Sequence, residues 1–244
     1  MDLVAGMTQI RGHGNDLIDA YVARPTTEGT FPGVVVAHHM PGLDEWSFEV
    51  TRRLAHHGYI AICPNLHYRS GPGSLDVVVQ RVRENGGLVD EIVLGDIEAS
   101  LFYLKSDQLL AKKVGIIGFC SGGRVAYLAS AKIGGFDAAV DCWGGNVIPA
   151  PERITASQPV SPIEMTEQIN CPILGIFGND DLNPDPDQVN RIEIELKKFG
   201  KEFEFHRYDG AGHGFFNWGS SNYRPEQSEH GWQKIFEFWE KTLV

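Results

Sequence analysis

Short apolar segments rich in β-branched residues recur along the chain and alternate with longer segments of helical periodicity. The apolar segments are 34–37, 60–62, 114–117, 138–143, 173–177 and 203–208. Each is short, continuous and bounded by polar or glycine-containing sequence, which is typical of strands that are buried on both faces. We therefore predict that these segments are the strands of one sheet.

Between these segments, apolar residues repeat every three or four positions. This period covers 45–57, 89–104, 121–131, 188–199 and 225–242. A strand, a helix and a further strand in succession require a crossover connection, so we predict a mostly parallel central sheet with helices on both faces. The opening segments 9–11 and 17–24 flank Gly12-His13-Gly14 and predict an antiparallel hairpin at the sheet edge.

Length and charge narrow the classes of protein that this pattern can represent. With 244 residues and 42% hydrophobic residues, the chain suits one large α/β domain, and we predict a single domain over 1–244. The Pro- and Ser-containing stretch 149–162 is interpreted as a surface excursion from that domain. A formal charge of −11 without a basic run argues against nucleic-acid and anionic-membrane partners.

The N-terminal segment and the cysteines favour a cytoplasmic protein. Residues 1–10 carry an early aspartate and lack a basic region followed by an apolar run, so we expect no secretory signal. No stretch approaches the length that spans a membrane. The cysteines lie far apart without a C-x-x-C pair, a poor pattern for zinc or for a disulfide framework: Cys63, Cys120, Cys142 and Cys171.

Cys120 differs from the other cysteines because it is centred in a G-x-C-x-G pattern between a predicted strand and a predicted helix. Gly118 and Gly122 flank it at two residues on either side, which allows a sharp strand-to-helix turn. Such a turn lifts the side chain above the sheet at a helix N-terminus, where the helix dipole favours a thiolate. We expect Cys120 to be a nucleophile and Ser121 to supply a backbone N–H. The alternative is a glycine-rich turn that merely packs closely.

An acid and a base for this nucleophile are expected on loops after later strands, in that order along the chain. The segment 178–184 follows a predicted strand and contains both Asp180 and Asp181. We favour Asp181, three residues after Gly178, and a one-residue error in favour of Asp180 stays open. His213, flanked by glycines after the last predicted strand, has the position of the base, because its ring could accept the thiol proton and return it to a leaving alcohol.

These segments together resemble the dienelactone hydrolase family, a branch of the α/β-hydrolases that uses cysteine where most relatives use serine. The resemblance extends over nearly the whole chain, and its most specific parts are 118–123 and 212–215. It implies an α/β-hydrolase fold in which Cys120, Asp181 and His213 are nucleophile, acid and base. It also implies that the backbone N–H of Met40 joins that of Ser121 in the oxyanion hole.

One departure from the family pattern concerns activation of the nucleophile. Family members place a glutamate at the end of the first core strand, whereas His39 stands there in the segment 37–42. His39 could hold the thiolate electrostatically, or it could be a pocket wall that donates a hydrogen bond to substrate. A metal held by His38, His39 and a third ligand is disfavoured, since adjacent residues of an extended segment point in opposite directions. We expect no metal and no organic cofactor.

A second departure concerns recognition of a substrate carboxylate, which family members with dienelactone activity bind through arginines. Asn217 takes the place of one such arginine after the histidine. Arg81 or Arg83 is a candidate for the other, and Arg69 is a further candidate, although each is also interpretable as a solvated cation. Loss of a bidentate arginine weakens carboxylate recognition. Trp46 is a candidate pocket aromatic, with core packing as its alternative.

The pattern as a whole predicts a cysteine-dependent hydrolase of a small ester or lactone that acts through a covalent acyl-enzyme. Two other interpretations stay open. One is a non-catalytic binding or redox-sensing protein that uses Cys120 as a reactive thiol. The other is a cysteine peptidase or acyltransferase. The sequence leaves open whether the protein is a monomer or a homodimer.

Overall fold

Eight strands of the described chain form one sheet, and the computed structural model describes residues 1–106 and 111–244. The strands are β1 Leu3–Arg11, β2 Leu17–Pro25, β3 Gly33–Ala37, β4 Ile60–Pro64, β5 Val114–Phe119, β6 Ala138–Cys142, β7 Ile173–Gly178 and β8 Phe203–Tyr208. Their order across the sheet is β1-β2-β4-β3-β5-β6-β7-β8. The β1–β2 and β2–β4 pairs are antiparallel and the pairs from β4 to β8 are parallel, which confirms the predicted fold class.

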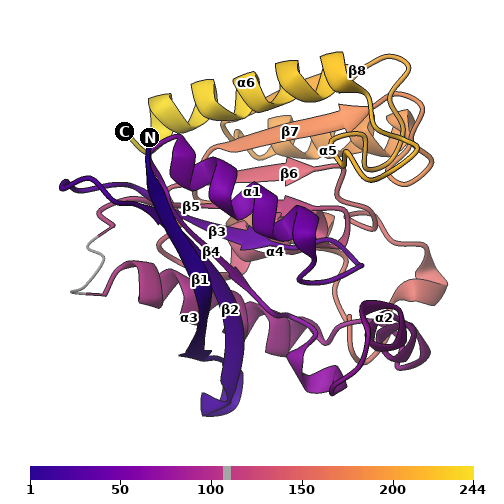
Figure 1. The fold of residues 1–244 in the computed structure, drawn as a ribbon. Helices are drawn as coiled ribbons and strands as arrows, with labels where there is room; N and C mark the ends of the chain where they lie inside the picture. Colours follow the sequence, from indigo (N-terminus) through magenta and orange to yellow (C-terminus); the bar gives the residue numbers. More distant parts are fainter. Residues whose placement is uncertain (107–110) are drawn as a thin grey trace.

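The helices cover both faces of the sheet (Figure 1). They are α1 Glu45–His56, α2 Leu75–Glu84, α3 Asp90–Leu104, α4 Ser121–Lys132, α5 Pro186–Lys198 and α6 Pro225–Thr242, with short 3-10 turns η1 His13–Asn15, η2 Tyr68–Ser70, η3 Pro151–Arg153 and η4 Pro162–Gln168. Apolar side chains of α1 and α6 pack on one face, and those of α3, α4 and α5 pack on the other.

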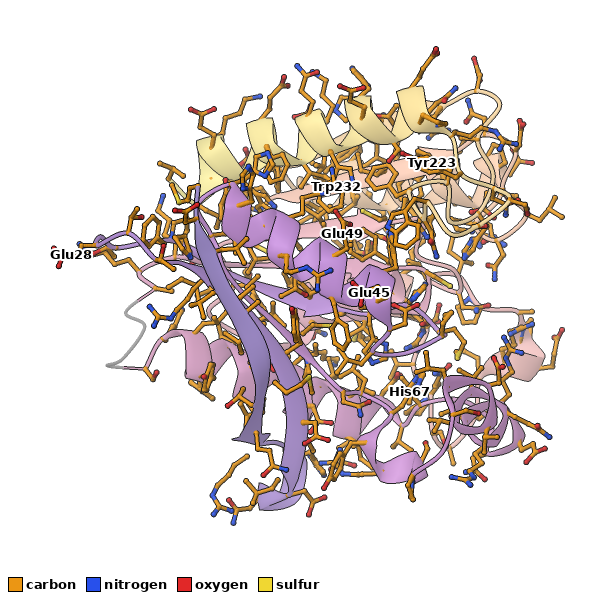
Figure 2. The ribbon with its side chains drawn as sticks, in the orientation of Figure 1. Glu28, Glu45, Glu49, His67, Tyr223 and Trp232 are labelled. Carbon is orange, nitrogen blue, oxygen red and sulfur yellow. The ribbon has the colours of Figure 1, made fainter. Side chains whose placement is uncertain are left out.

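The pleat of the strands explains why the core segments read as continuous apolar runs. In β3, Val34 and Val36 belong to the layer under α1 and α6, whereas Val35 belongs to the opposite layer. Successive side chains of a strand point to opposite faces, so a strand covered on both sides must be apolar throughout. Trp232 of α6 extends this packing toward α1 (Figure 2), where the Arg53 guanidinium lies 5.1 Å from its ring centroid.

Side-chain caps fix the start of two helices. Asp44 precedes α1 and accepts the Ser47 N–H at 2.8 Å, and Asp185 precedes α5 and accepts the Gln188 N–H at the same distance. Each cap satisfies a backbone donor that the first helical turn leaves without a partner. The Asp44 cap is important for the site because the loop that it closes carries Met40.

The structure adds elements that we did not predict. Helix α2 was missed although its apolar residues recur at helical spacing; it buries Val82 and leaves Leu75 and Val77 exposed. Strand β1 begins at Leu3, earlier than the predicted 9–11. Its first residues were missed because they alternate between exposed and half-buried positions at the sheet edge. Within the described residues, no helix is long and apolar enough to cross a membrane.

Candidate active site

Cys120 lies at the sharp turn between β5 and α4. Its φ of 56° and ψ of −118° are unusual for a residue with a side chain. A Cβ at Gly118 would collide with the Gly122 carbonyl, and a Cβ at Gly122 would collide with the Ala37 carbonyl. The turn therefore closes only with glycine on both sides of Cys120, as the motif predicts.

The loops that follow β7 and β8 lie at the same end of the sheet (Figure 1), and they carry Asp181 and His213. The His213 Nδ1 atom lies 2.8 Å from Asp181 Oδ2, and the Asn183 N–H donates to Asp181 Oδ1 at 2.9 Å. Asp181 is 4% exposed, whereas Asp180 is exposed. The carboxylate that contacts His213 is therefore that of Asp181, which the sequence analysis favoured over Asp180.

The electrostatics of these groups favour a charged cysteine–histidine pair. Burial by itself raises the pKa of the Cys120 thiol, but the hydrogen bond and charge of His213 outweigh it and the net shift is downward. Burial likewise lowers the pKa of His213, but hydrogen bonds to Asp181 and Cys120 dominate and raise that pKa to about 10. Both directions favour a thiolate beside an imidazolium at neutral pH.

Two backbone amides also face the thiol. The N–H groups of Ser121 and Met40 act on the Cys120 thiol and help to lower its pKa. Ser121 opens α4, and Met40 lies on the loop between β3 and α1. Two N–H groups that converge on a nucleophile can hold the oxygen that becomes negative when a carbonyl is attacked.

A cavity of about 830 Å³ opens directly onto these groups. Its lining includes Met40, Cys120, Ser121, Asp181 and His213. Its far wall comes from the end of α2 with the following glycine loop and from the 149–162 segment, and includes Arg83, Leu88, Glu152, Arg153, Thr155 and Gln158. The Gln158 side chain donates to the Leu88 carbonyl at 3.1 Å, which ties the two segments of that wall together.

His39 and Trp46, both predicted for the pocket, are absent from the described residues that line the cavity. The His39 Nε2 atom lies 2.8 Å from Asp44 Oδ2, and its ring centroid lies 4.7 Å from that of Trp46. Trp46 is 5% exposed and packs edge-on against Phe119. His39 therefore closes its own loop, and Trp46 follows the core-packing alternative.

The arginine candidates and Asn217 also have other partners. Arg69 forms ion pairs with Asp96 at 2.7 Å and Asp16 at 2.8 Å, and Arg81 donates to the carbonyls of Ser70 and Pro72. The Asn217 side chain accepts the Gly219 N–H within its own turn. The structure does not bring Arg69, Arg81 or Asn217 to the cavity, whereas it does bring Arg83 there.

A buried ion pair beneath the cavity was missed by the sequence reasoning. Arg124, one turn after Cys120 on α4, donates from both terminal nitrogens to Asp90 at 2.6 and 2.9 Å, and its side chain is 6% exposed. The spacing of Arg124, four residues after Cys120, was the available signal, because residues four apart share a helix face. Its partner Asp90 was not recognisable, since the pairing depends on how α3 docks.

The described residues contain no group of three or more His, Cys, Asp or Glu side chains arranged to hold a metal ion. The two adjacent histidines are engaged separately: His38 with the His39 carbonyl and the Leu66 N–H, and His39 with Asp44.

The parallel sheet, the strained nucleophile turn and the acid–histidine order define an α/β-hydrolase fold. The family model described as "Dienelactone hydrolase family" matches residues 18–243, and the chain belongs to that family. It is accordingly a hydrolase of the class that acts on ester and lactone bonds.

Individual relatives match over most of their length. A Salmonella typhimurium protein named "Putative carboxymethylenebutenolidase" is 31% identical over 96% of this chain and 86% of its own. A Bradyrhizobium protein named "Probable 2-oxo-3-(5-oxofuran-2-ylidene)propanoate lactonase" is 30% identical over 87% of this chain and 85% of its own. The crystal structure of a "Putative Dienelactone Hydrolase" from Klebsiella pneumoniae has a TM-score of 0.89, with 28% identity, 98% of this chain covered and 99% of that one.

Proposed function

We propose that the protein hydrolyses a small ester or lactone through a Cys120–His213–Asp181 triad and a covalent acyl-enzyme. The observation that carries this proposal is the convergence of His213 and of the Met40 and Ser121 amides on one thiol whose pKa they lower. The lactonase and butenolidase names of the relatives support a lactone as the substrate class.

The reaction proceeds in two steps. The Cys120 thiolate attacks the carbonyl carbon, and the oxygen that becomes negative is held by the Met40 and Ser121 N–H groups. When the tetrahedral intermediate collapses, His213 gives its proton to the leaving alkoxide; in a lactone, that hydroxyl stays attached to the acyl group. A water molecule then loses a proton to His213 and attacks the thioester, which releases the acid and restores the thiolate.

Asp181 keeps this histidine in the required state. Its carboxylate holds Nδ1–H, so Nε2 is left to exchange a proton with sulfur and with the leaving oxygen. The cavity of about 830 Å³ admits a substrate larger than a simple acetate ester. We expect its far wall to select the acyl portion.

The test is hydrolysis of a panel of five-membered lactones and aryl esters by the wild type, Cys120→Ala and Cys120→Ser. We expect Cys120→Ala to lose at least about 10³-fold in kcat. Mass spectrometry of acid-quenched wild type should show an adduct of the acyl group on the peptide that contains Cys120. Turnover that persists in Cys120→Ala would remove the thiol from the mechanism, and labelling of the thiol without turnover on any substrate would favour a sensor.

A further inference from the structure

The peptide group between His39 and Met40 joins the candidate oxyanion hole to the buried interior. Its N–H belongs to Met40, which lines the cavity beside Cys120 and helps to lower the pKa of that thiol, while its carbonyl belongs to His39. In a planar trans peptide the N–H and the C=O point in opposite directions. Whatever fixes the direction of the His39 carbonyl therefore also fixes the direction of the Met40 N–H.

Two donors hold that carbonyl. The His38 ring contacts the His39 oxygen through Nδ1 at 2.8 Å, and the Gly42 N–H donates to the same oxygen at 3.0 Å. The Gly42 bond is internal to the loop and moves with it. The His38 bond is anchored outside the loop, because the other ring nitrogen of His38 is tied to the segment after β4.

That second contact determines the tautomer of the ring. The Leu66 N–H donates to His38 Nε2 at 3.1 Å. A nitrogen that accepts a hydrogen bond carries no proton, so in the neutral ring the proton is on Nδ1 and is donated to the His39 carbonyl. His38 is 2% exposed, so water does not compete for either bond.

We propose that His38 is a positioning residue of the oxyanion hole, whose Nδ1–H holds the His39–Met40 peptide so that the Met40 N–H faces the reacting carbonyl. Donation to the carbonyl also polarises the peptide and makes its N–H a stronger donor. This inference rests on the proposed function, since it assigns a role within the same reaction.

Burial, more than neighbouring charge, keeps the His38 ring neutral. Burial, followed by the charge of His67, lowers the pKa of His38 to about 3, and burial followed by the charge of His39 lowers that of His67 to about 4. The His67 ring (Figure 2) meets the His38 ring edge-on at 4.8 Å, and Asp44 is the acidic group that acts on His38 in the opposite sense. The Nδ1–H tautomer is thus available across the neutral range.

Asparagine and glutamine form a matched pair for the test, because each preserves one end of the imidazole. His38→Asn can place its amide N–H where Nδ1–H lies and loses the contact with Leu66. His38→Gln can accept the Leu66 N–H through its longer side chain and loses the donor to the His39 carbonyl. Each variant removes one buried hydrogen bond, so a similar cost in melting temperature is expected for both.

Two measurements, hydrolysis of an activated aryl ester and alkylation of Cys120 by iodoacetamide, distinguish loss of the Met40 N–H orientation from general disruption of the active site. Alkylation forms no oxyanion, so its limiting rate at alkaline pH reports only that the thiolate is intact. We expect His38→Gln to lose about 10- to 100-fold in kcat with KM within about twofold, and His38→Asn to stay within about threefold of wild type. The limiting alkylation rate should stay within about twofold in both variants.

The control variant is His67→Phe. It removes a neighbouring buried imidazole whose Nε2 has no hydrogen-bond partner within 1–106 and 111–244, and it should leave kcat unchanged. Equal losses of kcat in His38→Asn and His38→Gln, no loss in His38→Gln, or a loss matched by an equal fall in alkylation would each overturn the proposal.

A measurement on the wild type does not depend on how the variants fold. The ¹⁵N chemical shifts of the His38 ring at pH 7 should show a neutral ring protonated on Nδ1. A ring protonated on Nε2, or a charged ring, would overturn the proposal. Activity that survives Cys120→Ala refutes the proposed function instead, whereas inactive Cys120→Ala together with fully active His38→Gln refutes this inference alone.

Discussion

At the scale of single residues, two neighbouring aspartates provide a sharp comparison. Asp181 is buried and contacts His213, whereas Asp180 is exposed on the same loop. Asp181→Asn keeps the shape of the side chain but removes the charge that stabilises the imidazolium, and we expect kcat to fall by about 10²-fold or more. Asp180→Asn should remain within about twofold of wild type in steady-state assays. Equal effects of the two changes would contradict the assignment.

The pH dependence of thiol alkylation follows from the two opposed pKa shifts. The pKa of Cys120 is lowered, so the reactive thiolate should persist at a lower pH than in a free cysteine, whose pKa is about 8.5. The pKa of His213 is raised to about 10, so the imidazolium that stabilises the thiolate is lost only at alkaline pH.

In His213→Asn, burial of the thiol is no longer offset by the imidazolium. The half-maximal pH for alkylation by iodoacetamide should therefore move upward by at least about one unit, as measured across pH 5–10. A profile that does not move would show that His213 does not control the ionisation of Cys120.

The sequence predicted Cys120, Asp181 and His213 better than it predicted the remaining residues of the cavity. Cys120, Asp181 and His213 follow the ends of three strands, and the direction of a strand end is set by the sheet. His39, Arg69 and Arg81 lie on segments whose side-chain directions depend on partners elsewhere, namely Asp44, Asp96 and two loop carbonyls. No local pattern encodes those partners.

At the scale of the elements, α4 is joined to α3 by the buried Arg124–Asp90 pair. Removing one partner leaves an uncompensated buried charge, so we expect Arg124→Met to lower the free energy of unfolding by about 3–5 kcal/mol in urea titrations. The double variant Arg124→Met/Asp90→Leu should recover most of that loss.

Lys198→Met is the surface control for this measurement. It breaks the exposed ion pair with Glu195 and should cost less than about 1 kcal/mol. Similar losses for Arg124→Met and Lys198→Met would show that burial of the Arg124 pair contributes little.

The apolar pattern predicted the helices that pack on the sheet, and α2 was missed. The α6 range 225–242 was predicted with its observed bounds, because its stripe of apolar residues packs on the sheet. In α2 the apolar residues 75, 78, 79 and 82 recur at helical spacing, and of these Val82 is buried. The periodic signal for α2 is thus present in the sequence, whereas the position of this helix relative to the sheet is not.

At the scale of the whole molecule, Asp141 in β6 makes stability depend on pH. It is 2% exposed, its Oδ2 has no hydrogen-bond partner among the described residues, and burial raises its pKa to about 7 despite the Gly144 N–H on Oδ1. Between about pH 4 and pH 7 the folded protein keeps a proton that the unfolded chain releases, so this group makes stability fall as pH rises.

Asp141→Asn cannot ionise and should lack that contribution. The difference in unfolding free energy between variant and wild type should shift in favour of the variant by a few kcal/mol from pH 5 to pH 8. Chemical denaturation at the two pH values measures it, and other titrating groups cancel because both proteins carry them. A difference that is independent of pH would show that Asp141 is ionised in the fold.

The far wall of the cavity lies apart from the strand ends that carry Cys120, Asp181 and His213. Its two segments, the end of α2 with the loop that follows and the 149–162 excursion, are joined to each other by the Gln158 side chain on the Leu88 carbonyl, and the excursion is joined to α3 by the Asp90 N–H on the Ser157 carbonyl. We expect insertions, deletions or exchanges there to leave the reacting groups in register. Proteins that descend from one scaffold can therefore differ in substrate while sharing one chemistry. A library of variants confined to this wall should change substrate selectivity at little cost to folding.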